Sequence, residues 1–130
     1  MTEIKTHGEV TLAKLEGDLD HHTAKLIRSQ IDREIVLRRP KRLVIDFSAV
    51  TFMDSSGIGL IMGRYKLMQE HGGEVTVARP PAYIKKVLRL AGIDKLTAIT
   101  DDIKSIMPPE NVEENKKESE EIEQTSAQTN

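Results

Sequence analysis

The sequence contains no cysteine and no tryptophan, and it has only two tyrosines and two phenylalanines among 130 residues. The lack of cysteine excludes disulfide bonds and thiolate metal sites, and it agrees with a reducing cytoplasm. With so few aromatic residues, the core has to be built from aliphatic side chains. Aromatic residues that could stack on bases are almost missing, and the charge is not strongly basic, so we expect no nucleic-acid partner.

Long apolar runs are also missing. The longest uncharged apolar stretch, residues 55–63, falls far short of the roughly 20 residues that a membrane-spanning helix needs. The first eight residues carry ionisable side chains and lack the apolar segment of a signal peptide. We therefore expect a cytoplasmic protein without a membrane partner.

Charge is distributed unevenly along the chain, although the net charge is only −2. Residues 110–130 hold seven glutamates and two lysines, whereas the preceding residues hold 17 basic and 14 acidic side chains. The acidic segment has no apolar periodicity and cannot bury enough surface to offset the entropy of ordering. The pattern predicts one folded domain over residues 1–107 and an acidic, disordered tail over residues 108–130.

Apolar periodicity divides the domain into alternating strands and helices. Strands are predicted at residues 3–6, 10–15, 43–47, 75–78 and 96–99. Helices are predicted at residues 24–37, 57–71, 80–92 and 101–107, and a turn at residues 16–18. Residues 43–47 form a nearly continuous apolar run, which is typical of a strand buried on both faces. This order predicts an α/β fold with a largely parallel sheet and one antiparallel pair near its start.

A polar cluster, Asp54-Ser55-Ser56, stands between the buried strand and the next helix. A serine in this place can cap the helix, because its hydroxyl accepts a hydrogen bond from a free amide of the first turn. A phosphoserine would also be tolerated there, close to the same amides and the positive end of the helix dipole. Both serines are candidates for phosphorylation, with Ser56 the expected cap and Ser55 the more exposed of the two.

Three glycines, Gly57, Gly59 and Gly63, follow this cluster. They are similar to a dinucleotide-binding loop, but the first glycine lies too far after the strand. We predict that Gly59 and Gly63 let the helix pack closely on the sheet. Such packing would explain why the helix contains two glycines, although each costs about 1 kcal/mol of helix stability relative to alanine. A nucleotide-dependent hydrolase is the enzymatic alternative. GxSxG is absent and no histidine spacing suits a metal, so we expect no catalytic residue, cofactor or metal.

Two segments together carry a family resemblance. GDLDHHTA at residues 17–24 and FMDSSGIG at residues 52–59 resemble the bacterial anti-sigma factor antagonists of the STAS domain family, over about residues 4–107. The continuation at residues 63–66 is most similar to the sporulation members. The resemblance implies a mixed sheet of four to five strands, with about four helices packed mainly on one side.

The resemblance also implies a mechanism and a site. Ser55 would be the phosphoacceptor of an anti-sigma factor that is itself an ATP-dependent serine kinase. The unphosphorylated protein would bind this kinase and release a sigma factor, phosphorylation would prevent binding, and a PP2C-type serine phosphatase would restore it. The residues implied in partner binding are Asp20, Asp54, Ser55, Ser56, Gly57, Ile58, Gly59 and Arg64. A STAS module of general stress sigma control or of a transporter is the alternative within the family.

Overall fold

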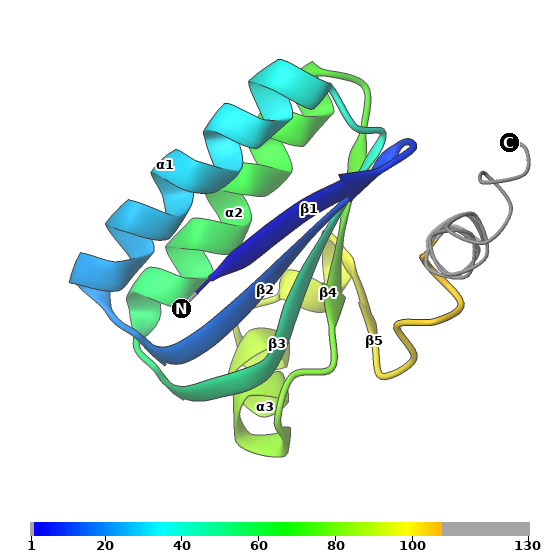
Figure 1. The fold of residues 1–130 in the computed structure, drawn as a ribbon. Helices are drawn as coiled ribbons and strands as arrows, with labels where there is room; N and C mark the ends of the chain where they lie inside the picture. Colours follow the sequence, from blue (N-terminus) through cyan, green and yellow to red (C-terminus); the bar gives the residue numbers. More distant parts are fainter. Residues whose placement is uncertain (1, 108–130) are drawn as a thin grey trace, which may run out of the picture.

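The computed structural model describes residues 2–107 (Figure 1). The predicted disordered tail lies outside the described residues. The strands are β1 (Glu3–His7), β2 (Val10–Leu19), β3 (Arg42–Met53), β4 (Glu74–Ala78) and β5 (Ala98–Thr100). The helices are α1 (His21–Arg38), α2 (Ser55–Glu70) and α3 (Ala82–Leu90), and a short 3-10 helix covers Ile93–Lys95.

The strands form one five-stranded sheet in the order β1-β2-β3-β4-β5. The pair β1 and β2 is antiparallel, and every later pair is parallel. Helices α1 and α2 run side by side on the same face of the sheet (Figure 1). The predicted α/β class, the mixed sheet and the single antiparallel pair near the start are confirmed.

The core lies between the sheet and the helices. Leu43, Ile45 and Phe47 on β3 belong to the same buried cluster as residues of all three helices, including Ile31 of α1 and Ile84 of α3. The intervening β3 residues, Val44 and Asp46, are also buried. The prediction that residues 43–47 are buried on both faces is therefore confirmed, although the helices pack mainly on one face.

Residues 101–107 do not form the fourth helix that the sequence predicted. Local side-chain bonds take up the backbone groups that a helix would use: the Lys104 amide donates to the Asp102 carboxylate at 3.0 Å, and the Asp102 amide donates to the Thr100 hydroxyl at 3.1 Å. Such bonds compete directly with helix formation. The domain therefore has three α-helices among its described residues, not about four.

The predicted turn at residues 16–18 is also wrong. Strand β2 continues to Leu19, with register shifts between Lys14 and Glu16 and between Gly17 and Asp18. Gly17 has a φ of 82°, which glycine adopts without strain, so the strand bends through irregular pairing and does not stop. The consequence is that β2 reaches as far as β3 at the edge of the sheet where the polar cluster lies.

An ion pair holds the start of the connection between β4 and α3. Asp46 of β3 is fully buried, and its carboxylate accepts hydrogen bonds from the Arg79 guanidinium and from the Ser48 amide. Arg79 adopts a φ of 50°, and its own amide donates to the Thr100 carbonyl at 2.7 Å. Arg79 thus joins β3, β4 and β5 immediately before the residues that lead into α3.

This pair makes stability depend on pH in the acid range. Burial raises the pKa of Asp46, but the hydrogen bonds from Arg79 and Ser48 outweigh burial and hold the pKa below its ordinary value of 3.8. A carboxylate with a lowered folded-state pKa stabilises the fold above the unfolded-state pKa, and this contribution is lost as the pH falls through the folded-state pKa. We expect the free energy of unfolding to decrease below about pH 4.

Denaturant titrations at pH 7, 5 and 3 measure this dependence. The Asp46→Asn variant should be less stable than the parent protein at pH 7 and should lose less stability between pH 5 and pH 3. Equal losses in the two proteins over that range would assign the acid sensitivity to other carboxylates.

Candidate functional site

The strands β2 and β3 end opposite each other, with Leu19 paired to Met53. An aspartate follows each strand directly, and a helix begins at the next residue: Asp20 precedes α1 and Asp54 precedes α2. The Asp54 amide donates to the Leu19 carbonyl at 3.2 Å, which ties the two chain segments together. Two helix N-termini are therefore placed side by side at one edge of the sheet.

Asp20 is the N-cap of α1 and forms a capping box with Thr23. The Thr23 amide donates to Asp20 Oδ1 at 3.0 Å, and the Asp20 amide donates to the Thr23 hydroxyl oxygen at the same distance. The hydrogen bond from the Thr23 amide is the main reason that the pKa of Asp20 is lowered. Asp20 therefore stays ionised at neutral pH in a fixed orientation, next to the start of α2.

Asp54 is the N-cap of α2. Its Oδ1 accepts a hydrogen bond from the Ser56 amide at 2.8 Å, and its carbonyl accepts one from the Gly57 amide at 3.0 Å. The expectation that Ser56 caps the helix is therefore wrong. Strand β3 extends to Met53, so the first residue available for a cap is Asp54, and both serines lie within the first turn.

The two serines differ in exposure. Ser55 is exposed at the first residue of α2, whereas Ser56 is half-buried and faces α1. Because the Asp54 carboxylate caps the Ser56 amide, neither serine hydroxyl is needed to cap the helix. The Ser55 hydroxyl is thus left available at a rigidly held position.

Only one of the three glycines is packed closely. A Cβ on Gly57 would lie 2.4 Å from Met53 Cγ and 3.1 Å from Leu19 Cδ2, whereas a Cβ on Gly59 or Gly63 would meet nothing within 4 Å. The prediction that Gly59 and Gly63 pack on the sheet is wrong, because both point away from it. Gly57 instead lets the first turn of α2 approach the ends of β2 and β3.

The outer face of α2 carries a stripe of exposed residues at helical spacing: Ser55, Gly59, Met62 and Lys66. Ile58 lies beside the stripe, partly buried against the core. At Gly59 the helix backbone is bare, so another molecule can approach it closely. The start of α2 therefore presents a hydroxyl, exposed backbone and an apolar side chain in succession.

Arg64 lies on the opposite side of α2 from this stripe. It is only 6% exposed, its Nε lies 2.8 Å from Asp32 Oδ1 of α1, and its Nη1 donates to the Leu60 carbonyl at 3.3 Å. The structure thus places Arg64 between α1 and α2, where it links the two helices.

Large apolar side chains near the site were not singled out from the sequence. Phe52 and Tyr83 are each 49% exposed and Met62 is 44% exposed. The Tyr83 hydroxyl donates to the Thr51 carbonyl at 2.8 Å, so α3 is attached to the end of β3 next to Phe52. Exposed side chains at alternating strand positions could have indicated Phe52, but no local pattern connects Tyr83 of α3 with β3.

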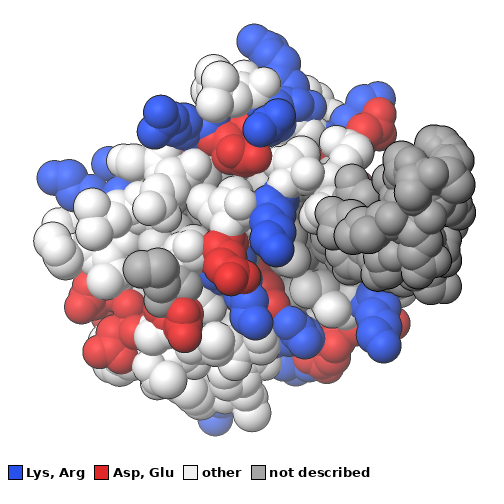
Figure 2. Space-filling model, in the orientation of Figure 1, with Lys and Arg blue, Asp and Glu red and all other residues white. Residues whose placement is uncertain are grey.

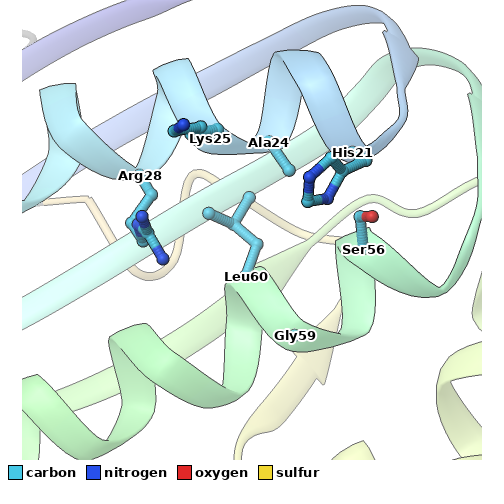
Figure 3. Close-up of a pocket in the computed structure, with 7 residues that line it drawn as sticks. All are labelled: His21, Ala24, Lys25, Arg28, Ser56, Gly59 and Leu60. Atoms are coloured by element: carbon cyan, nitrogen blue, oxygen red, sulfur yellow. The ribbon is translucent and has the colours of Figure 1, made fainter.

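A groove of about 360 Å³ separates the first halves of α1 and α2 (Figure 3). Its α1 wall carries His21, Lys25 and Arg28, and its α2 wall carries Ser56 and Leu60. In Figure 3 the basic side chains of α1 and the Ser56 hydroxyl lie on opposite sides of this groove. The groove is therefore basic, although it lies beside the two capping aspartates.

Residues 2–107 contain neither a cluster of metal ligands nor a membrane-spanning helix. No group of three histidine or carboxylate side chains there is placed to hold a metal ion. None of the helices in that range combines the length and the apolar character needed to cross a membrane.

The family model of the STAS domain matches residues 1–106. The chain therefore belongs to the STAS domain family. This agrees with the mixed sheet, the helices on one face and the two capped helix starts described above.

Known relatives narrow this assignment. The chain is 38% identical over 100 residues to the anti-sigma F factor antagonist of Paenibacillus polymyxa, covering 77% of this chain and 86% of that protein. It is 31% identical over 85 residues to the anti-sigma F factor antagonist of Lysinibacillus sphaericus, covering 65% and 73%. Within the STAS family the chain is thus an anti-sigma factor antagonist of the SpoIIAA type, as the solved structures also indicate.

Two solved structures of SpoIIAA are similar to this fold, each with 26% sequence identity. The anti-sigma factor antagonist SpoIIAA in its unphosphorylated form has a TM-score of 0.72, covering 82% of this chain and 93% of that one. The Bacillus cell fate determinant SpoIIAA in the phosphorylated form has a TM-score of 0.66, covering 82% and 96%. The fold of this chain is therefore found in a relative that exists in two phosphorylation states.

Proposed function

We propose that the chain is a cytoplasmic anti-sigma factor antagonist that is switched by phosphorylation of Ser55. The unphosphorylated form binds an anti-sigma factor and so releases a sigma factor, and the phosphorylated form does not bind. The observation that carries this proposal is the exposed Ser55 hydroxyl at the first residue of α2. Asp54 caps this helix through the Ser56 amide, so the Ser55 hydroxyl takes no part in the cap.

The electrostatics of the edge support a charge switch. Figure 2 shows acidic side chains gathered at the lower left, where β2 and β3 end in Figure 1. Asp18, Asp20 and Asp54 lie at these strand ends. A phosphate on Ser55 would add about −1.5 to −2 charges to this acidic edge. Such a change would alter strongly what a partner meets on the surface, while the positive end of the α2 dipole favours the phosphate within the fold.

We define the docking edge as the surface formed by Asp20, Asp54, Ser55, Ser56, Ile58 and Gly59. These residues come from two adjacent helix starts. Gly57 and Arg64, which the family resemblance also implies, support this edge from beneath: Gly57 lets α2 approach the strand ends, and Arg64 links α2 to α1.

The reactions that set the switch belong to the partners. In the forward step, an anti-sigma factor with serine kinase activity transfers the γ-phosphoryl group of ATP to the Ser55 oxygen, which releases ADP and the hydroxyl proton. In the reverse step, a PP2C-type phosphatase hydrolyses the phosphoserine to serine and inorganic phosphate. The chain itself needs no catalytic residue, because it is the substrate of both steps.

Incubation with ATP and a candidate anti-sigma factor, followed by phosphosite mapping by mass spectrometry, tests this proposal. We expect a single phosphate on Ser55, removed by a PP2C-type phosphatase. Phosphate on Ser56 would contradict the assignment of Ser55 as the phosphorylated residue. The anti-sigma factor used should be one that is shown to phosphorylate another antagonist. If this chain then takes up no phosphate, the proposal that phosphorylation controls its binding is wrong.

Gly59 provides a separate test of the docking edge. A Cβ at this position meets open space, and alanine is favoured over glycine in a helix by about 1 kcal/mol. We therefore expect Gly59→Ala to raise the free energy of unfolding by up to about 1 kcal/mol. If a partner contacts the bare backbone, the same methyl group should weaken partner binding about tenfold, which corresponds to roughly 1.4 kcal/mol.

Gly63→Ala is the matched control, since its Cβ also meets open space one helical turn farther from Ser55. It should stabilise the fold in the same way and affect binding less. Unfolding titrations and the dissociation constant for the anti-sigma factor measure the two effects. Unchanged binding by Gly59→Ala would remove Gly59 from the docking edge.

A further inference from the structure

Two of the four aromatic side chains are left half-exposed beside the docking edge. Phe47 is buried and Tyr65 packs against the core, but Phe52 and Tyr83 are each 49% exposed. Burial of apolar surface stabilises a fold, so large apolar side chains that stay exposed together mark a surface that binds another molecule.

Helix α3 extends this apolar surface. Tyr83, Val87 and Leu90 are spaced by four and three residues, so they form a stripe along one side of the helix. Val87 is 42% exposed and Leu90 is 81% exposed, whereas Ile84 and Leu88 of the same helix are fully buried. The helix thus packs on the core with one side and presents a second apolar side to solvent.

Hydrogen bonds fix the start of α3 to the strand ends. The Thr51 hydroxyl donates to Asp18 Oδ1 at 3.0 Å, and the Thr51 carbonyl accepts from the Tyr83 hydroxyl at 2.8 Å. Phe52 is the next residue of β3 and precedes Asp54, the cap of α2, by two positions. These bonds hold β2, β3 and α3 in one arrangement at the site.

We define the apolar patch as the surface formed by Phe52, Tyr83, Val87 and Leu90. Figure 2 shows a largely uncharged area at the bottom, where α3 lies in Figure 1. This area borders the acidic side chains at the lower left, where β2 and β3 end. The apolar patch and the docking edge are therefore neighbouring parts of one surface.

The docking edge alone is too small to hold a protein partner. It consists of a few residues from two helix starts, whereas a stable interface buries about 800 Å² and roughly 20–30 residues on each side. A partner that binds the docking edge must also contact the surface around it. Aromatic side chains contribute strongly to such interfaces, and the apolar patch offers two of them.

We propose that the anti-sigma factor contacts the apolar patch together with the docking edge, through an apolar surface of its own. The patch is uncharged and belongs to β3 and α3, whereas Ser55 belongs to α2. The patch therefore contributes affinity in both phosphorylation states, and Ser55 adds or removes the electrostatic part. This inference rests on the proposed function, because it names further residues that the same partner binds.

A lipid surface fits the apolar patch less well. Lys86 and Arg89 lie close to Leu90 and would favour anionic lipids. At the other end of the patch, however, Asp18 is bonded to the residue before Phe52, and the acidic edge continues from there. Like charges would repel an anionic membrane at this end, so a protein partner is favoured.

Alanine substitutions in the full chain test the proposal. Val87→Ala with Leu90→Ala shortens two exposed side chains and introduces good helix formers, so the fold should remain intact. We expect the dissociation constant of the unphosphorylated chain for the anti-sigma factor, measured by calorimetry, to rise about tenfold. Phe52→Ala should raise it by a similar factor.

Val36→Ala with Leu37→Ala is the matched control. Val36 and Leu37 are 53% and 68% exposed, and they lie at the end of α1 that is farther from the docking edge. This pair should leave the dissociation constant unchanged.

Phosphorylation of Ser55 in the parent chain is measured with the same partner, which separates the two possible failures. If the parent chain binds and is phosphorylated, equal dissociation constants for the parent and the α3 pair would overturn the role of the apolar patch. Equal weakening by the α3 pair and the α1 pair would overturn it as well. If the parent chain neither binds nor takes up phosphate, the proposed function is wrong, and this inference is wrong with it.

The contribution in both phosphorylation states is tested by combining the α3 pair with Ser55→Asp. Independent contributions to the binding free energy add, so the two fold-increases in the dissociation constant should multiply. If the α3 pair has no effect in the presence of Ser55→Asp, the patch is contacted only by the unphosphorylated form, and this part of the proposal is wrong.

Discussion

Ser55→Ala is expected to take up no phosphate when it is incubated with ATP and the anti-sigma factor, while it binds that partner as tightly as the unphosphorylated parent protein. The hydroxyl is the only group removed, and it makes no capping bond, because the Asp54 carboxylate caps the helix. The free energy of unfolding should therefore stay within about 0.5 kcal/mol of the parent value. Phosphate transfer followed by mass spectrometry and binding measured by calorimetry provide the readouts.

Ser55→Asp carries the complementary expectation. A carboxylate at the first residue of α2 adds charge next to Asp20 and Asp54, so partner binding should weaken at least tenfold, by roughly 1.4 kcal/mol or more. The same carboxylate lies at the positive end of the helix dipole, which favours it by about 0.3–1 kcal/mol. The variant should thus remain folded. If it unfolds, the charge acts through the stability of the domain and not through its surface.

Ser56→Ala is the control for both variants. Ser56 contributes its backbone amide to the cap and its hydroxyl faces the groove, so the substitution leaves Asp54 in place. Phosphate uptake by Ser56→Ala should match that of the parent chain. A loss of uptake equal to that of Ser55→Ala would show that the kinase does not distinguish the two serines by their exposure.

Arg79→Ala is expected to cost more stability than any exposed substitution. Asp46 is fully buried, and the loss of the guanidinium leaves its charge with the Ser48 amide alone. Breaking a buried ion pair by removing one partner typically costs about 3–5 kcal/mol. Because the Arg79 side chain is 39% exposed, water replaces part of the interaction, and we expect about 3 kcal/mol.

The acid sensitivity of the Arg79→Ala variant should change as well. Burial raises the pKa of Asp46, and without Arg79 less opposes that effect, so the loss of stability should begin at a higher pH than in the parent chain. Arg42→Ala is the matched control, because it removes a pair on the surface, Arg42 with Glu74, and should cost less than about 1 kcal/mol. If the two variants lose similar amounts of unfolding free energy, the buried ion pair contributes no more to stability than the surface pair.

The site owes its rigidity to a repeated arrangement at one edge of the sheet. Two parallel strands end in register, and each is followed by an aspartate that caps the next helix. Parallel neighbours necessarily direct both helix starts to the same edge. Asp20 and Ser55, which are 35 positions apart in the chain, are brought to that edge without any long loop.

Several elements of this arrangement could be predicted from the sequence. The apolar run at residues 43–47 indicated a buried strand, and the apolar periodicity of residues 24–37 indicated helix α1, because helical and strand periodicities are local. The motif residues at 17–24 and 52–59 identified the family. Whether Ser55 or Ser56 was the more exposed depended on where β3 ends, and that end is fixed by pairing with β2.

Other features were decided by contacts between distant segments. The bulge that carries β2 past Gly17 depends on pairing with β3, so the local Glu16-Gly17-Asp18 signal for a turn was misleading. The direction in which Gly59 and Gly63 point depends on which face of α2 packs on the sheet. The engagement of Arg64 by Asp32 depends on the packing of α2 against α1.

The amino-acid sequence by itself determined the α/β class, the family and the polar cluster that holds Ser55, since these depend on periodicity and on short motifs. The tertiary structure alone decided that Asp54 caps α2, that Gly57 is the closely packed glycine, and that a basic groove between α1 and α2 lies beside an acidic edge. Each of these depends on where two segments meet in space. Strand pairing and helix packing decide which segments come into contact, and neither can be predicted from residues that are neighbours in the sequence.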